Sequence, residues 1–119
     1  MCGIWGYLSK TDFYKQKQLY DAYTNVESRG PNKSDFLKIS GNLYQGFHRL
    51  AIMDTTSNGD QPFKLEFEER TIYCMCNGEI YNYKEIIEKY DLKLSSNSDC
   101  EVIPLLYLKL GIHLTVTSL

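Results

Sequence analysis

The sequence predicts an α+β fold in which several antiparallel strands carry helices on their faces. Short apolar runs bounded by turn residues are typical of strands, and longer segments with apolar residues every three or four positions are typical of helices. The chain has 119 residues, of which 43% are hydrophobic and 24% are charged. Since this is an ordinary size and composition for one globular unit, we expect residues 1–119 to form one domain or a fragment of one.

The first strand and the first helix are expected close to the N-terminus. Cys2–Leu8 is short, apolar and aromatic, which predicts a buried strand. Tyr14–Arg29 places apolar side chains at helical spacing and predicts an amphipathic helix with one inward face. Gly30 and Pro31 then end the helix, because glycine is favoured just past a helix end and proline cannot continue one.

Two β-hairpins are expected next. The first is closed by Gly41-Asn42, a common two-residue hairpin turn, and the second by Glu68-Glu69-Arg70. The polar segment Thr55–Pro62 between the hairpins predicts a loop. The four expected strands are Asp35–Ser40, Leu43–Leu50, Phe63–Phe67 and Thr71–Cys76.

Two further helices are expected in the last third of the chain. Tyr83–Tyr90 predicts a short helix, and a second helix opens at Ser98. Ser98 and Glu101 have the spacing of a capping box, in which each side chain bonds the other residue's backbone N–H. Pro104 lies beyond the first turn of this helix, so it should bend the helix or shift its start.

Charge and composition exclude several classes of function. The formal net charge of −2 excludes nucleic-acid binding through a broad basic face. No apolar run approaches the ~20 residues that a membrane span needs. Met1–Lys10 also lacks the basic segment and apolar stretch of a signal peptide. We therefore expect a cytoplasmic protein without a nucleic-acid or membrane partner.

The cysteines are expected to be reduced thiols that hold no metal. Cys74 and Cys76 are separated by one residue, which is closer than the ligand spacing of structural zinc sites, and no histidine pair follows them. Both are expected to pack in the core from one strand face. Bound zinc or oxidised cysteines would instead indicate a stabilised binding module. The four cysteines are Cys2, Cys74, Cys76 and Cys100.

The position of Cys2 is the most informative single feature of the chain. Removal of Met1 would make Cys2 the N-terminal residue, and its α-amine, whose ordinary pKa is ~7.7–8.0, could then accept the thiol proton. One residue would thus supply both nucleophile and base. Taken alone, a cysteine at this position is more often a small apolar residue in a terminal strand, so the assignment depends on the rest of the chain.

Five further motifs follow the N-terminal segment Met1-Cys2-Gly3-Ile4-Trp5-Gly6 in order. They are Arg29-Gly30-Pro31, His48-Arg49-Leu50-Ala51-Ile52-Met53-Asp54, Gln61-Pro62, Asn77-Gly78-Glu79-Ile80-Tyr81-Asn82 and Ser98-Asp99-Cys100-Glu101-Val102. Together they resemble the class II glutamine amidotransferases, which use an N-terminal nucleophile. The second and fourth of these five motifs resemble the asparagine synthetase branch of that family.

The resemblance implies a fold and a reaction. The fold is similar to that of the N-terminal-nucleophile hydrolases, an αββα sandwich of two antiparallel sheets between helical layers, incomplete at the C-terminus. The implied reaction is hydrolysis of L-glutamine, in which Cys2 attacks the side-chain amide, ammonia leaves, and water converts the thioester to glutamate. Asn77 and Gly78 match the pair that stabilises the oxyanion.

The resemblance also implies how glutamine is bound. Arg49 matches the residue that binds the α-carboxylate, for which a guanidinium fork is suited. Asp99 matches the residue that binds the α-ammonium group, and Glu79 belongs to a motif that assists it. Leu50 and Ile52 would contribute backbone contacts. His48 is expected to be structural, because the α-amine of Cys2 already supplies the base.

Family members continue into further strands and an ATP-dependent synthetase domain, which the 119 residues do not include. The resemblance therefore implies no cofactor in this chain, with ATP and Mg belonging to the synthetase domain. An incomplete sheet would expose an edge at which a separate synthetase domain or a second copy of the chain can pair. The alternative is a non-catalytic, truncated domain that binds glutamine or pairs with a partner chain.

Overall fold

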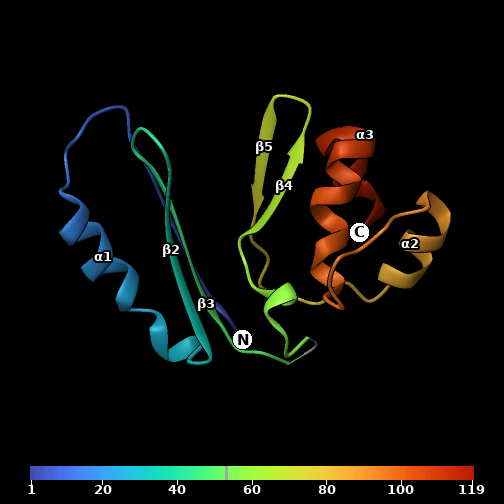
Figure 1. Cartoon of the computed structure of the whole chain (residues 1–119), viewed down its shortest axis with the longest axis horizontal. Coiled ribbons are helices and arrows are strands. Elements are labelled where there is room, and N and C mark those ends of the chain that lie inside the picture. Colours follow the sequence, from blue (N-terminus) through green and yellow to red (C-terminus); the bar gives the residue numbers. More distant parts are fainter. Residues whose placement is uncertain (53) are drawn as a thin grey trace. The chain divides into compact units, whose positions relative to one another are not determined.

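Two antiparallel sheets, each with its own helices, make up the structure (Figure 1). The computed structural model describes residues 1–52 and 54–119, so Met53 of the predicted His48–Asp54 motif lies outside the described residues. The chain divides into two units, Met1–Ala51 and Ile52–Leu119. Both units combine strands and helices, which confirms the predicted α+β class.

The first unit is a three-stranded sheet with one helix beside it (Figure 1). The strand order is β1-β3-β2, so β3, the last of the three strands along the chain, lies in the middle of the sheet. Gly3 pairs with His48 in one ladder, and Lys33 pairs with Arg49 in the other. The elements are β1 (Gly3–Leu8), α1 (Gln16–Thr24), a 3₁₀ turn (Glu27–Arg29), β2 (Lys33–Ser40) and β3 (Leu43–Arg49).

The predicted helix over Tyr14–Arg29 is too long. Helix α1 begins after Lys15, whose backbone N–H is accepted at 2.9 Å by the Gln18 side chain. It ends at Thr24, whose hydroxyl donates to the Asp21 carbonyl oxygen at 2.8 Å. This side-chain bond competes with the backbone hydrogen bonds that would continue the helix. The rest of the predicted helix contains the tighter 3₁₀ turn that leads to Gly30.

Tyr23 is the centre of the first unit's core. Its ring is 1% exposed, stacks on the His48 ring at 4.0 Å and meets Trp5 edge to face. The backbone of Gly46 lies directly against this ring, because a Cβ added there would be 2.4 Å from the Tyr23 Cδ2 atom. The central strand therefore needs glycine at position 46 to let the helix approach the sheet.

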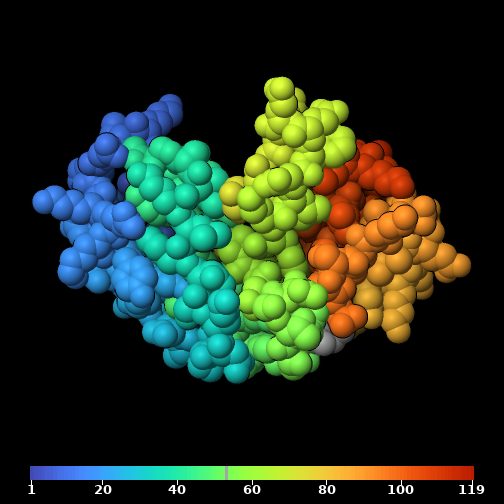
Figure 2. All heavy atoms as spheres, viewed as in Figure 1, coloured from blue at the N-terminus to red at the C-terminus, as the bar shows by residue number. Residues whose placement is uncertain are grey.

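The second unit places a hairpin and two helices together. Figure 2 shows the atoms of the hairpin, in yellow-green, against those of α3, in red. The buried core forms where Ile86 of α2 meets Val102 and Leu106 of α3. The elements are a 3₁₀ turn (Ser57–Gly59), β4 (Phe63–Phe67), β5 (Arg70–Cys74), α2 (Tyr83–Tyr90), a 3₁₀ turn (Asp99–Glu101) and α3 (Val102–Ser118).

Strand β5 is shorter at its end than predicted. It ends at Cys74, so Cys76 lies in the following irregular segment and the expected shared strand face of Cys74 and Cys76 is wrong. The hairpin turn is also one residue tighter than predicted, because Glu68 adopts the left-handed conformation (φ 53°) and Arg70 already belongs to the strand.

Helix α3 begins at Val102, later than Ser98, so the predicted shift of its start by Pro104 is confirmed. The helix is not bent at Pro104; its irregular residue is Gly111. Pro104 occupies the first turn of α3, where the missing N–H has no helical partner to lose. The helix is interrupted at Gly111 (φ 77°, ψ 170°), a conformation that only glycine adopts readily.

The segment Asp99–Ser118 is long and apolar enough to cross a membrane by length and composition, with a mean hydropathy of 1.3. The expectation that no apolar run approaches the length of a membrane span is therefore wrong for this segment of 20 residues. Its buried residues include Val102 and Leu106, which pack against α2, and Asp99 and Glu101, which are buried and charged. The first turns of α3 therefore pack in the core, whereas Ile112, Leu114 and Val116, beyond the break at Gly111, are exposed, and 33% of the apolar window is buried.

The contact between Gly46 and Tyr23 predicts a large effect of one added methyl group. Gly46→Ala should lower the free energy of unfolding by about 1–3 kcal/mol, because the new Cβ overlaps a buried ring. Gly6→Ala on β1 is the matched control, since its nearest atom, the Tyr44 carbonyl oxygen, lies 4.0 Å away. Urea unfolding of both variants measures the difference, and equal midpoints would contradict the packing argument.

Candidate active site

The Cys2 thiol lies at the start of β1 and contacts the backbone of Leu50. The Leu50 N–H donates to the Cys2 Sγ atom at 3.3 Å, and the thiol can donate to the Leu50 carbonyl oxygen at 3.7 Å. The Arg29 Nε–H donates to the Cys2 carbonyl oxygen at 3.1 Å. Both the sulfur and the backbone of this residue are therefore held in place.

Arg49 ends strand β3 beside this thiol contact and is 7% exposed. Asn32 fixes the backbone around it: its N–H donates to the Arg49 carbonyl oxygen, and its side-chain oxygen accepts the Ala51 N–H, both at 3.0 Å. Asn32 thus holds the chain on either side of Leu50. A buried guanidinium on a fixed backbone is suited to bind a carboxylate in one orientation.

His48 has a structural role, as predicted. The Ser34 hydroxyl lies 2.7 Å from His48 Nδ1, and the Tyr23 carbonyl oxygen lies 3.0 Å from Nε2. With both ring nitrogens hydrogen-bonded and the residue 1% exposed, His48 ties strand β2 and helix α1 to the central strand.

Asp99 organises the candidate site residues of the second unit. It is 5% exposed, and its Oδ2 atom accepts the Ile80 N–H at 2.6 Å. The Cys100 thiol donates to the Gly78 carbonyl oxygen at 3.4 Å. Two consecutive residues before α3 therefore hold the turn that carries Asn77, Gly78 and Glu79, all three of which are exposed.

Two other buried carboxylates fix the loop before Asp99. The Glu101 side chain accepts four hydrogen bonds, from the backbone N–H and the hydroxyl of both Ser95 and Ser96, at 2.5 to 2.9 Å. Asp54 accepts the Asn97 N–H at 2.8 Å through one oxygen and both donors of Thr56 through the other. This loop is therefore positioned by carboxylates and not by regular secondary structure.

The expected capping box is wrong, because Glu101 bonds Ser95 and Ser96, and Ser98 makes no side-chain cap bond. Burial alone would raise the pKa of the Glu101 carboxyl. Hydrogen bonds from Ser96 and Ser95 outweigh that effect and hold this pKa below its ordinary value. The sequence signal that could have indicated this arrangement is the serine-rich segment Ser95-Ser96-Asn97-Ser98, which comes directly before Asp99-Cys100-Glu101.

The cysteines of the second unit differ in environment. Burial raises the pKa of the Cys74 thiol to about 11. A hydrogen bond from Cys100 lowers the pKa of Cys76, and the same contact raises that of Cys100. The backbone N–H of Cys76 donates at 2.7 Å to the side chain of Gln61, a buried residue of the predicted Gln61-Pro62 motif.

The eight predicted site residues are divided between the two units. Within the first, Cys2 and Leu50 are in contact and Arg49 adjoins them. Within the second, Asp99 is bonded to the turn that follows Gly78, and the Ile52 side chain is 69% exposed. Arg29, Asn32, Gln61, Asp54 and Glu101 support these residues and were not assigned such roles from the sequence.

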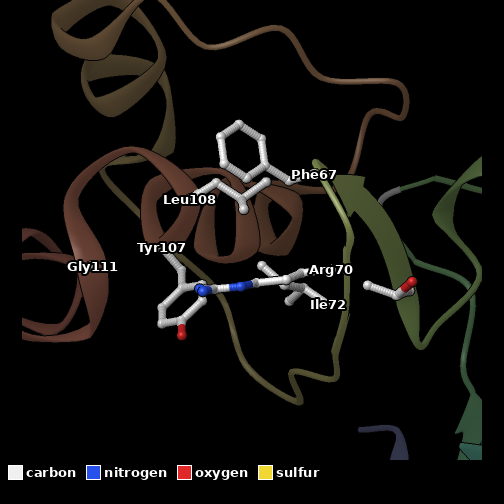
Figure 3. Close-up of a pocket in the computed structure, with 7 residues that line it drawn as sticks. Phe67, Arg70, Ile72, Tyr107, Leu108 and Gly111 are labelled. Atoms are coloured by element: carbon white, nitrogen blue, oxygen red, sulfur yellow. The ribbon is translucent and has the colours of Figure 1, made fainter.

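A cavity of about 600 Å³ lies between the β4–β5 hairpin and α3. Figure 3 shows the Arg70 side chain extending toward the Tyr107 ring, with Ile72 and Leu108 nearby. Its lining residues come from the hairpin and α3, whereas the predicted site residues of this unit come from other segments. Within residues 1–52 and 54–119, no group of three or more His, Cys, Asp or Glu side chains could hold a metal ion.

Comparisons with known proteins agree in the family that they indicate. A profile described as "Glutamine amidotransferase domain" matches residues 1–119. A protein of Acanthamoeba polyphaga mimivirus named "Probable asparagine synthetase (glutamine-hydrolyzing)" is 39% identical over 110 residues, covering 87% of this chain and 19% of the relative. Asparagine synthetase (glutamine-hydrolyzing) of Mesocricetus auratus is 35% identical over 121 positions, covering 100% of this chain and 21% of the relative. The chain thus spans about a fifth of the length of these relatives.

The bonds to Glu101 predict a pH-dependent stability. Because its pKa is lowered in the folded protein, this carboxylate stabilises the fold above its unfolded-state pKa of ~4.3, and the contribution is lost as pH falls through the folded-state pKa. Glu101→Gln should lower the free energy of unfolding by about 2 kcal/mol at neutral pH. The glutamine NH₂ group is a donor, so it cannot accept the N–H and hydroxyl groups that one carboxylate oxygen of Glu101 accepts. It should also flatten the acid limb of the stability profile.

Glu88→Gln, on the exposed face of α2, is the matched control for this experiment. Urea unfolding between pH 3 and 7 gives both quantities. A Glu101→Gln profile that runs parallel to the wild-type profile would contradict the assigned role.

Proposed function

Because the chain belongs to the glutamine amidotransferase domain family, we propose that it hydrolyses L-glutamine to glutamate and ammonia through Cys2. It would act as the glutaminase part of an asparagine synthetase-like enzyme. The observation that carries this proposal is the Cys2 sulfur, held 3.3 Å from the Leu50 N–H beside the buried Arg49. The printed names of the relatives, which are glutamine-hydrolysing synthetases, support the choice of glutamine.

Removal of Met1 is the first requirement of the reaction. Met1 is 76% exposed, so its loss would uncover no core surface. The α-amine of Cys2, with an ordinary pKa of ~7.7–8.0, then accepts the thiol proton directly or through water. The Leu50 N–H donates to the sulfur that becomes the nucleophile. The hydrogen bond from Arg29 to the Cys2 carbonyl oxygen fixes the backbone position of Cys2.

The chemistry proceeds by addition and elimination at the glutamine amide carbon. The Cys2 thiolate adds to that carbon, and the carbonyl oxygen becomes an oxyanion that accepts bonds from the Asn77 side chain and the Gly78 N–H. Collapse of this intermediate expels ammonia, whose nitrogen takes up the proton held by the α-amine. Water then hydrolyses the thioester and releases glutamate, with the same amine as base.

Glutamine would be selected by its charges. Arg49 binds the α-carboxylate, and Asp99 binds the α-ammonium group with assistance from Glu79. Leu50 and Ile52 contribute backbone contacts. A ligand that lacked either charge would lose its charge-assisted bonds to Arg49 or Asp99, and this difference in binding energy gives specificity for glutamine.

The reaction needs no cofactor in this chain. ATP and Mg would belong to a synthetase domain that receives the ammonia, either in the same protein or on a partner, and we place the protein in the cytoplasm. A second copy of the chain, pairing at an open sheet edge, would be a further partner.

Replacement of the nucleophile tests the reaction. Cys2→Ala should reduce glutamate release by at least about a thousandfold, because no other group forms the thioester. Cys74→Ala removes a thiol from β5 and should retain activity. Intact mass measured on each preparation establishes that Met1 has been removed. Equal glutamate release by Cys2→Ala and the processed wild-type protein would refute the proposed role of Cys2.

Replacement of Arg49 tests how glutamine is bound. Arg49→Lys should raise the KM for glutamine by about tenfold or more with a smaller effect on kcat, since lysine keeps the charge but not the two-pronged geometry. Arg70→Lys, at an exposed position of β5, is the control and should leave KM unchanged. An unchanged KM in Arg49→Lys would exclude Arg49 from carboxylate binding.

A further inference from the structure

Two thiols of the second unit, Cys76 and Cys100, meet at the turn that follows β5. The Cys100 Sγ atom lies 3.4 Å from the Gly78 carbonyl oxygen, and a Cβ placed on Gly78 would lie 3.9 Å from the Cys76 Sγ atom. Their mutual influence agrees with this placement, because the interaction with Cys100 lowers the pKa of Cys76 and the interaction with Cys76 raises that of Cys100. Their sulfurs are therefore neighbours although 24 positions separate them in the sequence.

The backbones on both sides of this thiol pair are fixed. The Cys76 N–H is bonded to Gln61 at 2.7 Å, and Asp99, the residue before Cys100, holds the Ile80 N–H at 2.6 Å. Formation of a disulfide would bring the two sulfurs, which both lie beside Gly78, to the ~2.05 Å of an S–S bond. Because the backbones are held by these bonds, we expect closure to come from rotation of the two side chains.

The two thiols differ in reactivity in the manner that oxidation requires. The contact between the two thiols lowers the pKa of Cys76 and raises that of Cys100, whose S–H group bonds the Gly78 carbonyl oxygen. Cys76 is half-buried, whereas Cys100 is 4% exposed. Cys76 is thus the thiol that a small oxidant can reach as the thiolate, and Cys100 is the neighbour able to resolve the product.

The structure assigns Cys76 and Cys100 as a redox modification site that forms an intramolecular disulfide when the protein meets a peroxide. The Cys76 sulfur attacks one peroxide oxygen, the O–O bond breaks, and a sulfenic acid and one molecule of water result. The Cys100 sulfur then attacks the sulfenic sulfur, the S–S bond forms, and hydroxide leaves with the Cys100 proton as a second water. Two thiols are oxidised by two electrons in total, and hydrogen peroxide is reduced to two molecules of water.

The consequence for glutamine rests on the proposed function. Cys76 directly precedes the oxyanion pair Asn77 and Gly78, and Cys100 directly follows Asp99. Oxidation removes the S–H group that bonds the Gly78 carbonyl oxygen, so the turn loses one of the bonds that hold it. Loss of one such bond should weaken glutamine binding roughly five- to tenfold.

The first experiment measures the disulfide without any need for activity. A Cys2→Ala/Cys74→Ser double variant of the full chain, in which Cys76 and Cys100 are the remaining cysteines, is treated with hydrogen peroxide and digested with trypsin without reduction. The expected product is a covalent link between peptides Thr71–Lys84 and Leu94–Lys109, formed in monomeric protein and lost after dithiothreitol. Unlinked peptides, or a link found only in a dimer, would overturn the assignment.

Matched variants show whether the pair acts as a unit. Adding Cys100→Ala to the double variant should abolish the link and let Cys76 proceed to sulfinic acid, because nothing resolves the sulfenic acid. Cys76→Ala should leave Cys100 as a thiol, since burial protects it. Circular dichroism establishes that each variant is folded. Oxidation of Cys100 in the Cys76→Ala variant at the rate seen in the double variant would contradict the assigned order of events.

The second experiment measures the effect on the ligand. The double variant is titrated with glutamine by calorimetry before oxidation, after oxidation and after dithiothreitol, with the variant that also carries Cys100→Ala treated in parallel. The expected result is a five- to tenfold loss of affinity on oxidation that dithiothreitol reverses. The variant with Cys100→Ala lacks the S–H bond to Gly78 from the start, so it should bind glutamine before oxidation as weakly as the linked protein does. Unchanged affinity in linked protein would refute the effect on glutamine while the disulfide stands. Absence of binding in the reduced protein would count against the proposed function and, with it, against this effect.

Discussion

Hydrogen bonds from backbone N–H groups to buried carboxylates hold together the part of the second unit that carries the candidate site. Asp99 accepts the N–H of Ile80, Glu101 those of Ser95 and Ser96, and Asp54 that of Asn97. A buried charge is costly unless it is bonded, so loss of a loop's conformation would leave its carboxylate buried without these bonds. Segments without regular secondary structure thereby acquire one defined geometry.

In the first unit, the defined geometry comes from close packing of backbone segments against one another. A Cβ on Gly30 would lie 2.0 Å from the His48 carbonyl oxygen, and one on Gly3 would lie 2.8 Å from that of Val26. The segment after α1 therefore passes directly against the end of β3 and the start of β1. This approach brings the Arg29 Nε–H to the Cys2 carbonyl oxygen, which gives the Arg29-Gly30-Pro31 motif a physical role.

The sequence predicted elements whose signals are local. Alternating apolar runs and the Gly41-Asn42 turn located β2 and β3, and helical spacing located α2 at the residues observed. Interactions between distant residues could not be predicted in this way. Glu101 had the right spacing for a capping box but bonds earlier serines, and Cys76 and Cys100 are neighbours because of how the turn after β5 meets the start of α3. Motif resemblance, and not spacing, selected the site residues.

Asp99 shows why structural and binding roles need not be alternatives. One of its oxygens accepts the Ile80 N–H, but a carboxylate offers about four lone-pair sites, so the group can also accept an ammonium donor. The Ile80 bond fixes the carboxylate and the turn with Gly78 relative to each other before any ligand arrives. A cation bound to Asp99 would therefore meet a group whose orientation is already set, at little cost in side-chain entropy. The same bond that stabilises the fold thus also prepares the site for its ligand.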